Sequence, residues 1–153
     1  MKTPLNLPAI DARIRESVNG KEEIFDPLRK KYVALTPEEW VRQHMVRFLI
    51  LQLGCPASLI TVEAPLKYHS RKKRTDIVVH GRDGKPALIV ECKSPKVALD
   101  QQVLQQAAMY NMPLQVRYVI LTNGMQHLVL YLDQAEQKIT YRDSFPVFSD
   151  LCP

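Results

Sequence analysis

The sequence has few cysteines and no long apolar run, and each shortage excludes a class of protein. The three cysteines, Cys55, Cys92 and Cys152, are scattered and show no CxxC spacing, which argues against a disulfide framework and a cysteine-based zinc site. No segment approaches the roughly 18 apolar residues of a membrane span, and residues 1–15 lack the apolar core of a signal peptide. We therefore expect a cytoplasmic protein with reduced cysteines and no membrane partner.

Length and composition are those of one folded domain. The chain has 153 residues, 46% hydrophobic and 24% charged, and a chain of this size buries roughly two thirds of its unfolded surface. A formal net charge of +5 favours anionic partners. We expect an N-terminal arm and hairpin over residues 1–21 and a single globular domain over residues 22–153.

Turn and capping residues divide the chain into strands and helices. Asn19-Gly20 predicts a hairpin, and Thr36-Pro37 predicts a helix start, with Glu39 completing a capping box. The expected elements are a hairpin over residues 11–25, a strand over 31–35, a helix from Pro37 to near Gly54, strands over 59–63, 76–79 and 87–90, a helix over 99–112, and strands over 116–122, 126–132 and 138–141. This order predicts an α/β fold in which helices flank a central sheet, with a crossover connection to the strand after the second helix.

Polar residues gather at one end of the two central strands. Asp76 opens the first strand, and Glu91 and Lys93 close the second on a shared face, whereas Cys92 points to the opposite face. If residues 82–86 form the turn between these strands, Asp76 comes close to Glu91. Two carboxylates at short range repel each other unless a cation lies between them. The pair therefore predicts a divalent metal site.

The element order and three motifs resemble the PD-(D/E)XK nucleases. The motifs are Asp76 in RTDIVV, Glu91-Cys92-Lys93 in ALIVECKSP, and Gln106 to Tyr110, which matches a QxxxY helix motif. The segments TPEEWVRQH, KKRTDIVV and VILTNG look most like the N-terminal nuclease domain of type I restriction enzyme R subunits, over roughly residues 22–132. The resemblance implies a restriction-endonuclease-like fold with an αβββαβ core and an N-terminal β-hairpin extension.

The same resemblance implies a Mg²⁺- or Mn²⁺-dependent endodeoxyribonuclease that hydrolyses phosphodiester bonds. The metal ligands that it implies are Asp76, Glu91 and the main-chain carbonyl of Cys92. Lys93 would orient the attacking water or stabilise charge in the transition state. Gln106 and Tyr110, one helical turn apart, would face the site from the second helix.

Several residues keep two interpretations. Glu39 is a metal ligand if this chain follows the branches in which the first helix contributes an acid, or it is only a capping residue. Glu63 could also approach the metal, or it lies at the periphery of the site. The tetrad Arg71, Lys72, Lys73 and Arg74, expected in a loop before Asp76, binds nucleic-acid phosphates or is simply solvated. Glu91 and Lys93 could also form a surface ion pair, worth less than about 1 kcal/mol.

We expect the chain to bind nucleic acid, and DNA in particular. Three hypotheses about its function follow. The first is a free-standing nuclease, which would act on both strands of a duplex most simply as a homodimer. The second is a catalytically silent nucleic-acid-binding module. The third is a subunit that works only with a separate motor or specificity subunit, because we expect no helicase motor in this chain. The sequence shows neither a base-reading element nor a dimer interface.

Overall fold

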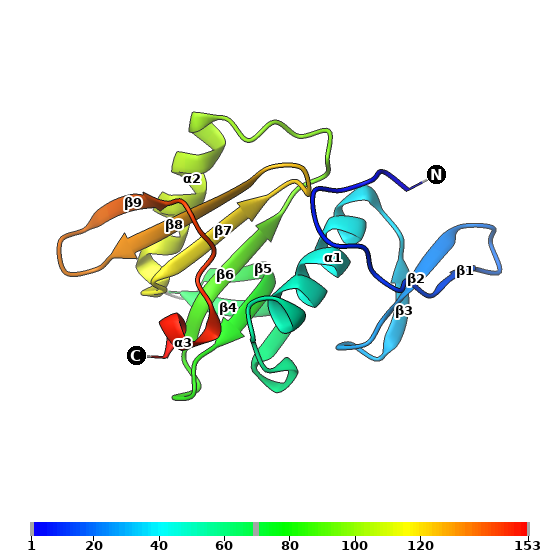
Figure 1. The fold of residues 1–153 in the computed structure, drawn as a ribbon, viewed down its shortest axis with the longest axis horizontal. Coiled ribbons are helices and arrows are strands. Elements are labelled where there is room, and N and C mark those ends of the chain that lie inside the picture. The colour runs from blue at the N-terminus through cyan, green and yellow to red at the C-terminus, as the bar shows by residue number, and fades with distance from the viewer. Residues whose placement is uncertain (1, 69–70, 153) are drawn as a thin grey trace.

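The computed structural model describes residues 2–68 and 71–152, without the side chains of residues 64–74. Its elements form a small sheet of order β1-β2-β3 and a large sheet of order β4-β5-β6-β7-β8-β9 (Figure 1). The elements are β1 (Ile14–Glu16), β2 (Glu22–Asp26), β3 (Lys31–Ala34), α1 (Pro37–Leu51), β4 (Ile60–Tyr68), β5 (Arg71–His80), β6 (Pro86–Cys92), α2 (Gln101–Asn111), β7 (Tyr118–Thr122), β8 (His127–Asp133), β9 (Lys138–Arg142) and α3 (Phe148–Leu151).

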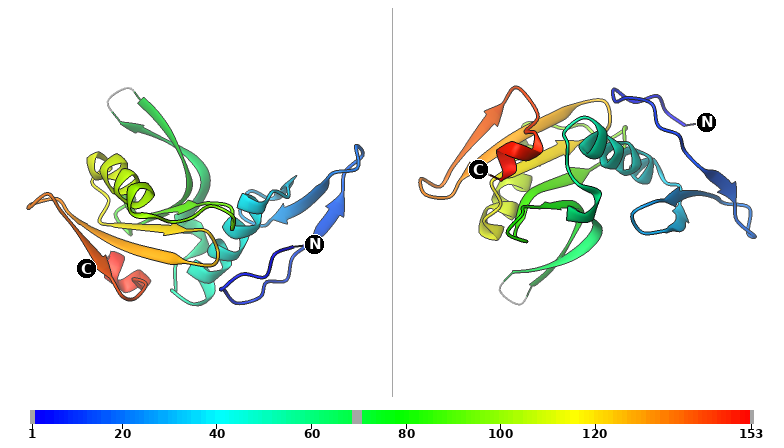
Figure 2. Two further views of the ribbon diagram at one scale, coloured as in Figure 1. Left: turned by 90° about the horizontal axis from the view of Figure 1, so that it is seen from above. Right: turned by 60° about the horizontal axis from the view of Figure 1, so that its bottom comes forward.

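The large sheet is mixed and lies between helices. β6 and β7 are parallel, and the other neighbouring strands are antiparallel. The connection from β6 to β7 runs through α2, which is the predicted crossover. α1 and α3 cover one face of the sheet and α2 covers the other (Figure 2). The structure therefore confirms the predicted α/β class with a central mixed sheet flanked by helices.

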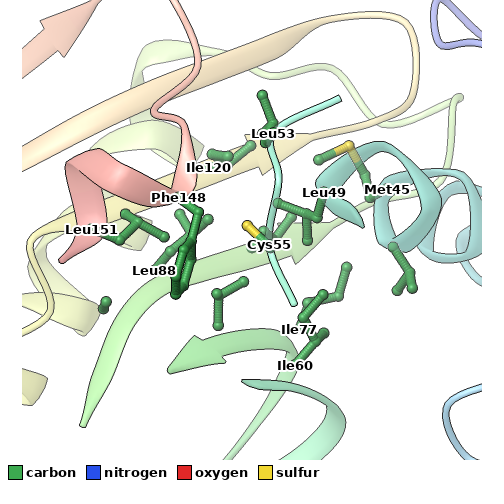
Figure 3. Close-up of a cluster of buried hydrophobic side chains, with 14 of the residues drawn as sticks. Met45, Leu49, Leu53, Cys55, Ile60, Ile77, Leu88, Ile120, Phe148 and Leu151 are labelled. Carbon is green, nitrogen blue, oxygen red and sulfur yellow. The ribbon is translucent and has the colours of Figure 1, made fainter. Parts of the chain in front are cut away.

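The main core lies between α1 and the sheet. Thr36 caps α1 through its side chain, Pro37 occupies the first turn, and an i, i+4 row of Val41, Met45 and Leu49 is completely buried. Figure 3 shows how these apolar side chains meet residues of the sheet and of α3. The labelled members are Met45, Leu49, Leu53, Cys55, Ile60, Ile77, Leu88, Ile120, Phe148 and Leu151. No helix of the described ranges has the length and apolar character that crossing a membrane requires.

The predicted loop around the basic tetrad is wrong. The backbone of residues 71–74 belongs to β5, which pairs with β4 as far as Tyr68 opposite Arg71, so Asp76 lies inside a strand and does not open it. β5 pairs with β6 only from Ile77 onward. Residues 60–68 and 71–80 therefore continue beyond the sheet as a two-stranded ribbon, which rises on the same side as α2 (Figure 2, left).

The predicted N-terminal hairpin around Asn19-Gly20 is present and has a third strand. β1 pairs with β2, and β2 pairs with β3, with Ile14, Ile24 and Val33 in one register row. β2 begins at Glu22, so the two strands of the hairpin fall on opposite sides of the boundary expected between residues 21 and 22. This small sheet lies beside the N-terminal half of α1 (Figure 1), where it adjoins the site described next.

Candidate active site

Asp76 lies at the fork where β5 separates from β6. The last ladder pair before the fork joins Ile77 to Val90, and continuing this register places Asp76 opposite Glu91. The backbone N–H of Cys92 donates to Asp76 Oδ2 over 2.8 Å. This bond fixes the Asp76 carboxylate at the C-terminal end of β6, and the sequence-based expectation that Asp76 approaches Glu91 agrees with the register.

Glu91 and Lys93 face α2. The amide of Asn111, a fully buried residue, donates to Glu91 Oε1 over 3.0 Å and to the carbonyl of Ala107 over 2.7 Å. Lys93 directly follows β6, and its N–H donates to the Thr122 carbonyl over 2.7 Å. Asn111 was not among the predicted site residues, because an asparagine at the end of a helix usually indicates only helix termination.

The residues of the QxxxY motif meet this pair. A cavity of about 270 Å³ is lined by Glu91, Lys93, Val103, Gln106, Ala107 and Tyr110. Gln106 and Tyr110 contribute from the exposed face of α2, and Glu91 and Lys93 from the end of β6. The structure thus brings together four of the five residues that the sequence nominated for catalysis, and Asp76 stands on the neighbouring strand.

The carboxylate of Glu39 is buried at the start of α1 and does not close a capping box. Its N–H donates to Thr36 Oγ1 over 3.0 Å, which is the expected half of that motif. The carboxylate instead accepts from Arg29 over 2.8 Å, from Gln43 over 2.9 Å, and from Arg42. Glu39 is therefore held by cations and an amide, beside the fork.

Arg42 is the centre of an acidic cluster that sequence analysis did not find. Its Nη2 contacts Asp76 Oδ1 at 2.7 Å, Glu63 Oε1 at 2.9 Å and Glu38 Oε1 at 3.4 Å, and its Nη1 bonds Glu39. Burial favours a lower pKa for the Arg42 guanidinium, but the hydrogen bond to Asp76 and the charges of Glu39 and Asp76 prevail and raise the pKa. The i, i+3 spacing to Glu39 was a weak signal, since surface helices commonly carry such pairs.

The cluster extends to the N-terminal sheet through Arg29. Arg29 Nε contacts Asp26 Oδ2 at 2.5 Å and Nη2 contacts Glu39 Oε2, and the Asp26 side chain is 1% exposed. Burial alone would raise the pKa of the Asp26 carboxyl, but bonds from the Arg29 side chain and from backbone N–H groups lower it. Alternating charges therefore connect β2 to Asp76 through α1.

Histidine and cysteine side chains of this region have structural surroundings. His44 Nδ1 lies 2.8 Å from the Trp40 carbonyl, and burial lowers the pKa of its ring. The Cys92 thiol is buried in the core, which raises its pKa well above the ordinary value. This thiol does not suit nucleophilic chemistry at neutral pH. The predicted phosphate contacts of Arg71, Lys72, Lys73 and Arg74 concern side chains that lie outside the described part of the chain.

The donor types of the site fit a hard divalent cation, whereas their present arrangement does not. Asp76, Glu91 and Glu63 supply carboxylate oxygens, which Mg²⁺ and Mn²⁺ prefer. Within the described ranges, however, no group of three or more His, Cys, Asp or Glu side chains is placed to hold a metal ion. Positive charge at Asp76 comes from Arg42.

Comparison with known proteins places the chain in a family. The model of the type I restriction enzyme R protein N terminus (HSDR_N) matches residues 37–146, well over half of the chain. No curated protein sequence matches the chain significantly.

Two solved structures match the chain, and the first of them is similar in fold. One, from Vibrio vulnificus YJ016, is described as a fragment of an HsdR subunit of a type I restriction enzyme; it has a TM-score of 0.53 and 24% identity over 76% of this chain and 24% of that chain. The other, from Anabaena variabilis ATCC 29413, is described as a nuclease of the DUF820 group; it has a TM-score of 0.49 and 14% identity over 90% of this chain and 92% of that chain. The present chain thus spans about a quarter of the Vibrio chain. On the strength of the family match, the chain belongs to the type I restriction enzyme R protein N-terminus family.

Proposed function

We propose that this chain is a divalent-metal-dependent nuclease that hydrolyses DNA phosphodiester bonds at the fork between β5 and β6. The main support for this proposal is the strand register, which places Asp76 opposite Glu91. In addition, Glu91 and Lys93 share a cavity with two polar residues of α2. An acid pair with an adjacent ammonium group suits phosphodiester hydrolysis, because charge accumulates on the phosphate during the reaction.

Each side chain has a proposed role. Asp76, Glu91 and the Cys92 carbonyl hold Mg²⁺ or Mn²⁺, which when bound polarises the phosphate and lowers the pKa of a water molecule. Lys93 orients the attacking water and stabilises charge on the phosphate. Asn111 keeps Glu91 in place through its amide. Gln106 and Tyr110 position Lys93 or the nucleic acid from α2, and Glu39 supports Asp76 through Arg42.

DNA is the proposed substrate, and the ribbon of β4 and β5 supports this choice. The ribbon carries Arg71, Lys72, Lys73 and Arg74 in one strand and rises on the side of the sheet that bears α2 and the cavity of Glu91. A basic ribbon on this side of the sheet would contact phosphates and hold the duplex without reading its sequence. The type I restriction enzyme family also points to DNA.

Activity that depends on a partner is the second candidate. The similar Vibrio chain is about four times as long as the matched region, so the relative holds further parts that could supply DNA translocation or target choice. The bonds that already occupy Asp76 and Glu91 also fit a site that is silent until a partner or a metal rearranges it. In that case the purified chain binds DNA and metal and cuts only when the partner is added.

Cleavage assays separate these candidates. The purified chain is incubated with plasmid and with linear single-stranded DNA in Mg²⁺, in Mn²⁺ and in EDTA, beside Glu91→Ala and Lys93→Ala. Lys96→Ala removes an exposed lysine of the next turn and serves as the matched control. The nuclease proposal is supported if cutting depends on the metal, is lost in the two site variants and is kept in the control. If the wild-type chain cuts nothing, the free-standing enzyme is excluded.

A further inference from the structure

The Arg42 guanidinium occupies a position at which several carboxylates converge. Its side chain is 6% exposed, and it pairs with acids from α1, β4 and β5. Among the described residues, the connected ion pairs join five carboxylates to two guanidinium groups. The carboxylates are Asp26, Glu38, Glu39, Glu63 and Asp76, and the cations are Arg29 and Arg42.

The Glu38 carboxyl, one of these acids, has an altered pKa. Burial and the nearby charge of Asp76 raise the pKa of the Glu38 carboxyl, against the influence of Arg42 and Lys93. Burial is the larger cause, and the charges of Asp76 and Glu63 act in the same direction. Converging carboxylates attract cations, and within the described residues no group of three is arranged around a metal ion while Arg42 is in place.

We propose that Arg42 is a resident cation that stands in for the divalent ion at Asp76 and competes with it. The inference rests on the proposed metal-dependent nuclease. Asp76 Oδ2 accepts the Cys92 N–H and Oδ1 accepts Arg42, so a cation that binds Asp76 meets the guanidinium at close range. Like charges at that distance repel strongly in a partly buried site. Metal binding therefore requires Arg42 to withdraw from Asp76.

Two features allow that withdrawal. Arg42 Nε is buried without a hydrogen-bond partner, the only such side-chain nitrogen or oxygen found among the described residues. The present position of the guanidinium is therefore not fully satisfied, which lowers the cost of leaving it. A cavity of about 510 Å³ beside Arg42, lined in part by Glu38, Glu39 and Glu63, gives the head group room to move while it keeps acidic partners.

Binding of Mn²⁺ to the purified chain tests this competition without using activity. Isothermal titration compares the wild type with Arg42→Met, which keeps an unbranched apolar stem and removes the guanidinium group with its charge. We expect Arg42→Met to bind Mn²⁺ about tenfold more tightly or better, the effect of removing one competing charge-assisted hydrogen bond. In EDTA, Arg42→Met should have a lower Tm than the wild type. On addition of Mn²⁺, the Tm of Arg42→Met should rise by more than that of the wild type. Arg47→Met, five residues further along α1 and bonded to Gln43, is the matched control and should keep the wild-type affinity.

A second measurement needs no variant. In ¹⁵N-labelled wild-type protein, the Nε–H resonance of Arg42 should shift on titration with Mg²⁺ and saturate with the binding curve, while that of Arg47 stays constant. Equal or weaker Mn²⁺ binding by Arg42→Met, or Mg²⁺ saturation without a change at Arg42, overturns the competition and leaves the nuclease intact. Failure of the wild type to bind either ion overturns both proposals.

Discussion

Substituting Arg29, in the turn between β2 and β3, by alanine should destabilise the protein far more than removing an exposed arginine of β1. The Arg29 side chain is 18% exposed and bridges the buried carboxylates of Asp26 and Glu39 at 2.5 and 2.8 Å. Removing one partner of a buried ion pair costs about 3 kcal/mol. At about 2–4 °C per kcal/mol for a chain of this size, Arg29→Ala should lower Tm by about 6–12 °C.

The control for this prediction is Arg15→Ala. Arg15 pairs with Glu23 at 3.0 Å, but its side chain is 55% exposed, so its loss should cost no more than about 1 kcal/mol. Thermal unfolding followed by circular dichroism at pH 7 measures both variants. Equal shifts for Arg29→Ala and Arg15→Ala would refute the claim that the buried charges depend on Arg29.

The dependence on pH gives an independent check of the same ion pair. The pKa of Asp26 is lowered in the folded protein, so its contribution to stability is present above its unfolded pKa of about 3.9 and is lost as pH falls through the folded value. In Arg29→Ala the bond from the Arg29 side chain to Asp26 is lost, so burial raises the pKa of the Asp26 carboxyl relative to the wild type. The Tm difference between the wild type and Arg29→Ala should therefore be largest near pH 7 and narrow below about pH 4. A difference that stays constant with pH would contradict the assignment.

Two further predictions concern buried polar groups near the site. Asn111→Ala removes the amide that donates to Glu91 and should lower the free energy of unfolding by about 2 kcal/mol in urea titrations, whereas Gln102→Ala on the exposed face of α2 should change it by less than about 0.5 kcal/mol. Burial and the charge of Arg47 lower the pKa of His44, so the wild type should lose stability as pH falls below about 6.5. His44→Gln cannot titrate and should lose less stability between pH 7.5 and 5.5; an identical loss would show that His44 does not carry this dependence.

Much of the large sheet could be predicted because its strands carry local signals. Buried apolar runs such as Ala87–Val90 and the turn residues that bound them indicate strands directly. Thr36 and Pro37 likewise locate the start of α1, and the structure has the cap at the same residue. These are effects of neighbouring residues, so the sequence contains them without knowledge of the fold.

The ribbon could not be predicted because its outer half lacks those signals. Residues 71–74 are all cations, and Pro65 interrupts the opposite strand, so neither stretch shows the apolar alternation of a half-buried strand. The ribbon instead follows from the pairing of β4 with β5, which continues past the large sheet in the same register. Such pairing depends on the backbone and is not visible in composition.

The site could be predicted only in part for a related reason. Motif spacing located Asp76, Glu91 and Lys93, because alternation along a strand decides which side chains share a face. Arg42 bonds residues from three separate elements, and long-range ion pairs leave no periodic pattern in a sequence. Asn111 escaped detection in the same way, since its partner lies on β6.

The most direct test of the central claim is the rate of plasmid cleavage in Mn²⁺ by the wild type and by Lys93→Ala. A positioned group that transfers protons or stabilises charge contributes about 10²–10⁴-fold in rate. The account predicts cutting by the wild type that EDTA stops, a loss of about this size in Lys93→Ala, and an unchanged Tm. Cleavage that persists at the wild-type rate in Lys93→Ala would contradict the proposed site.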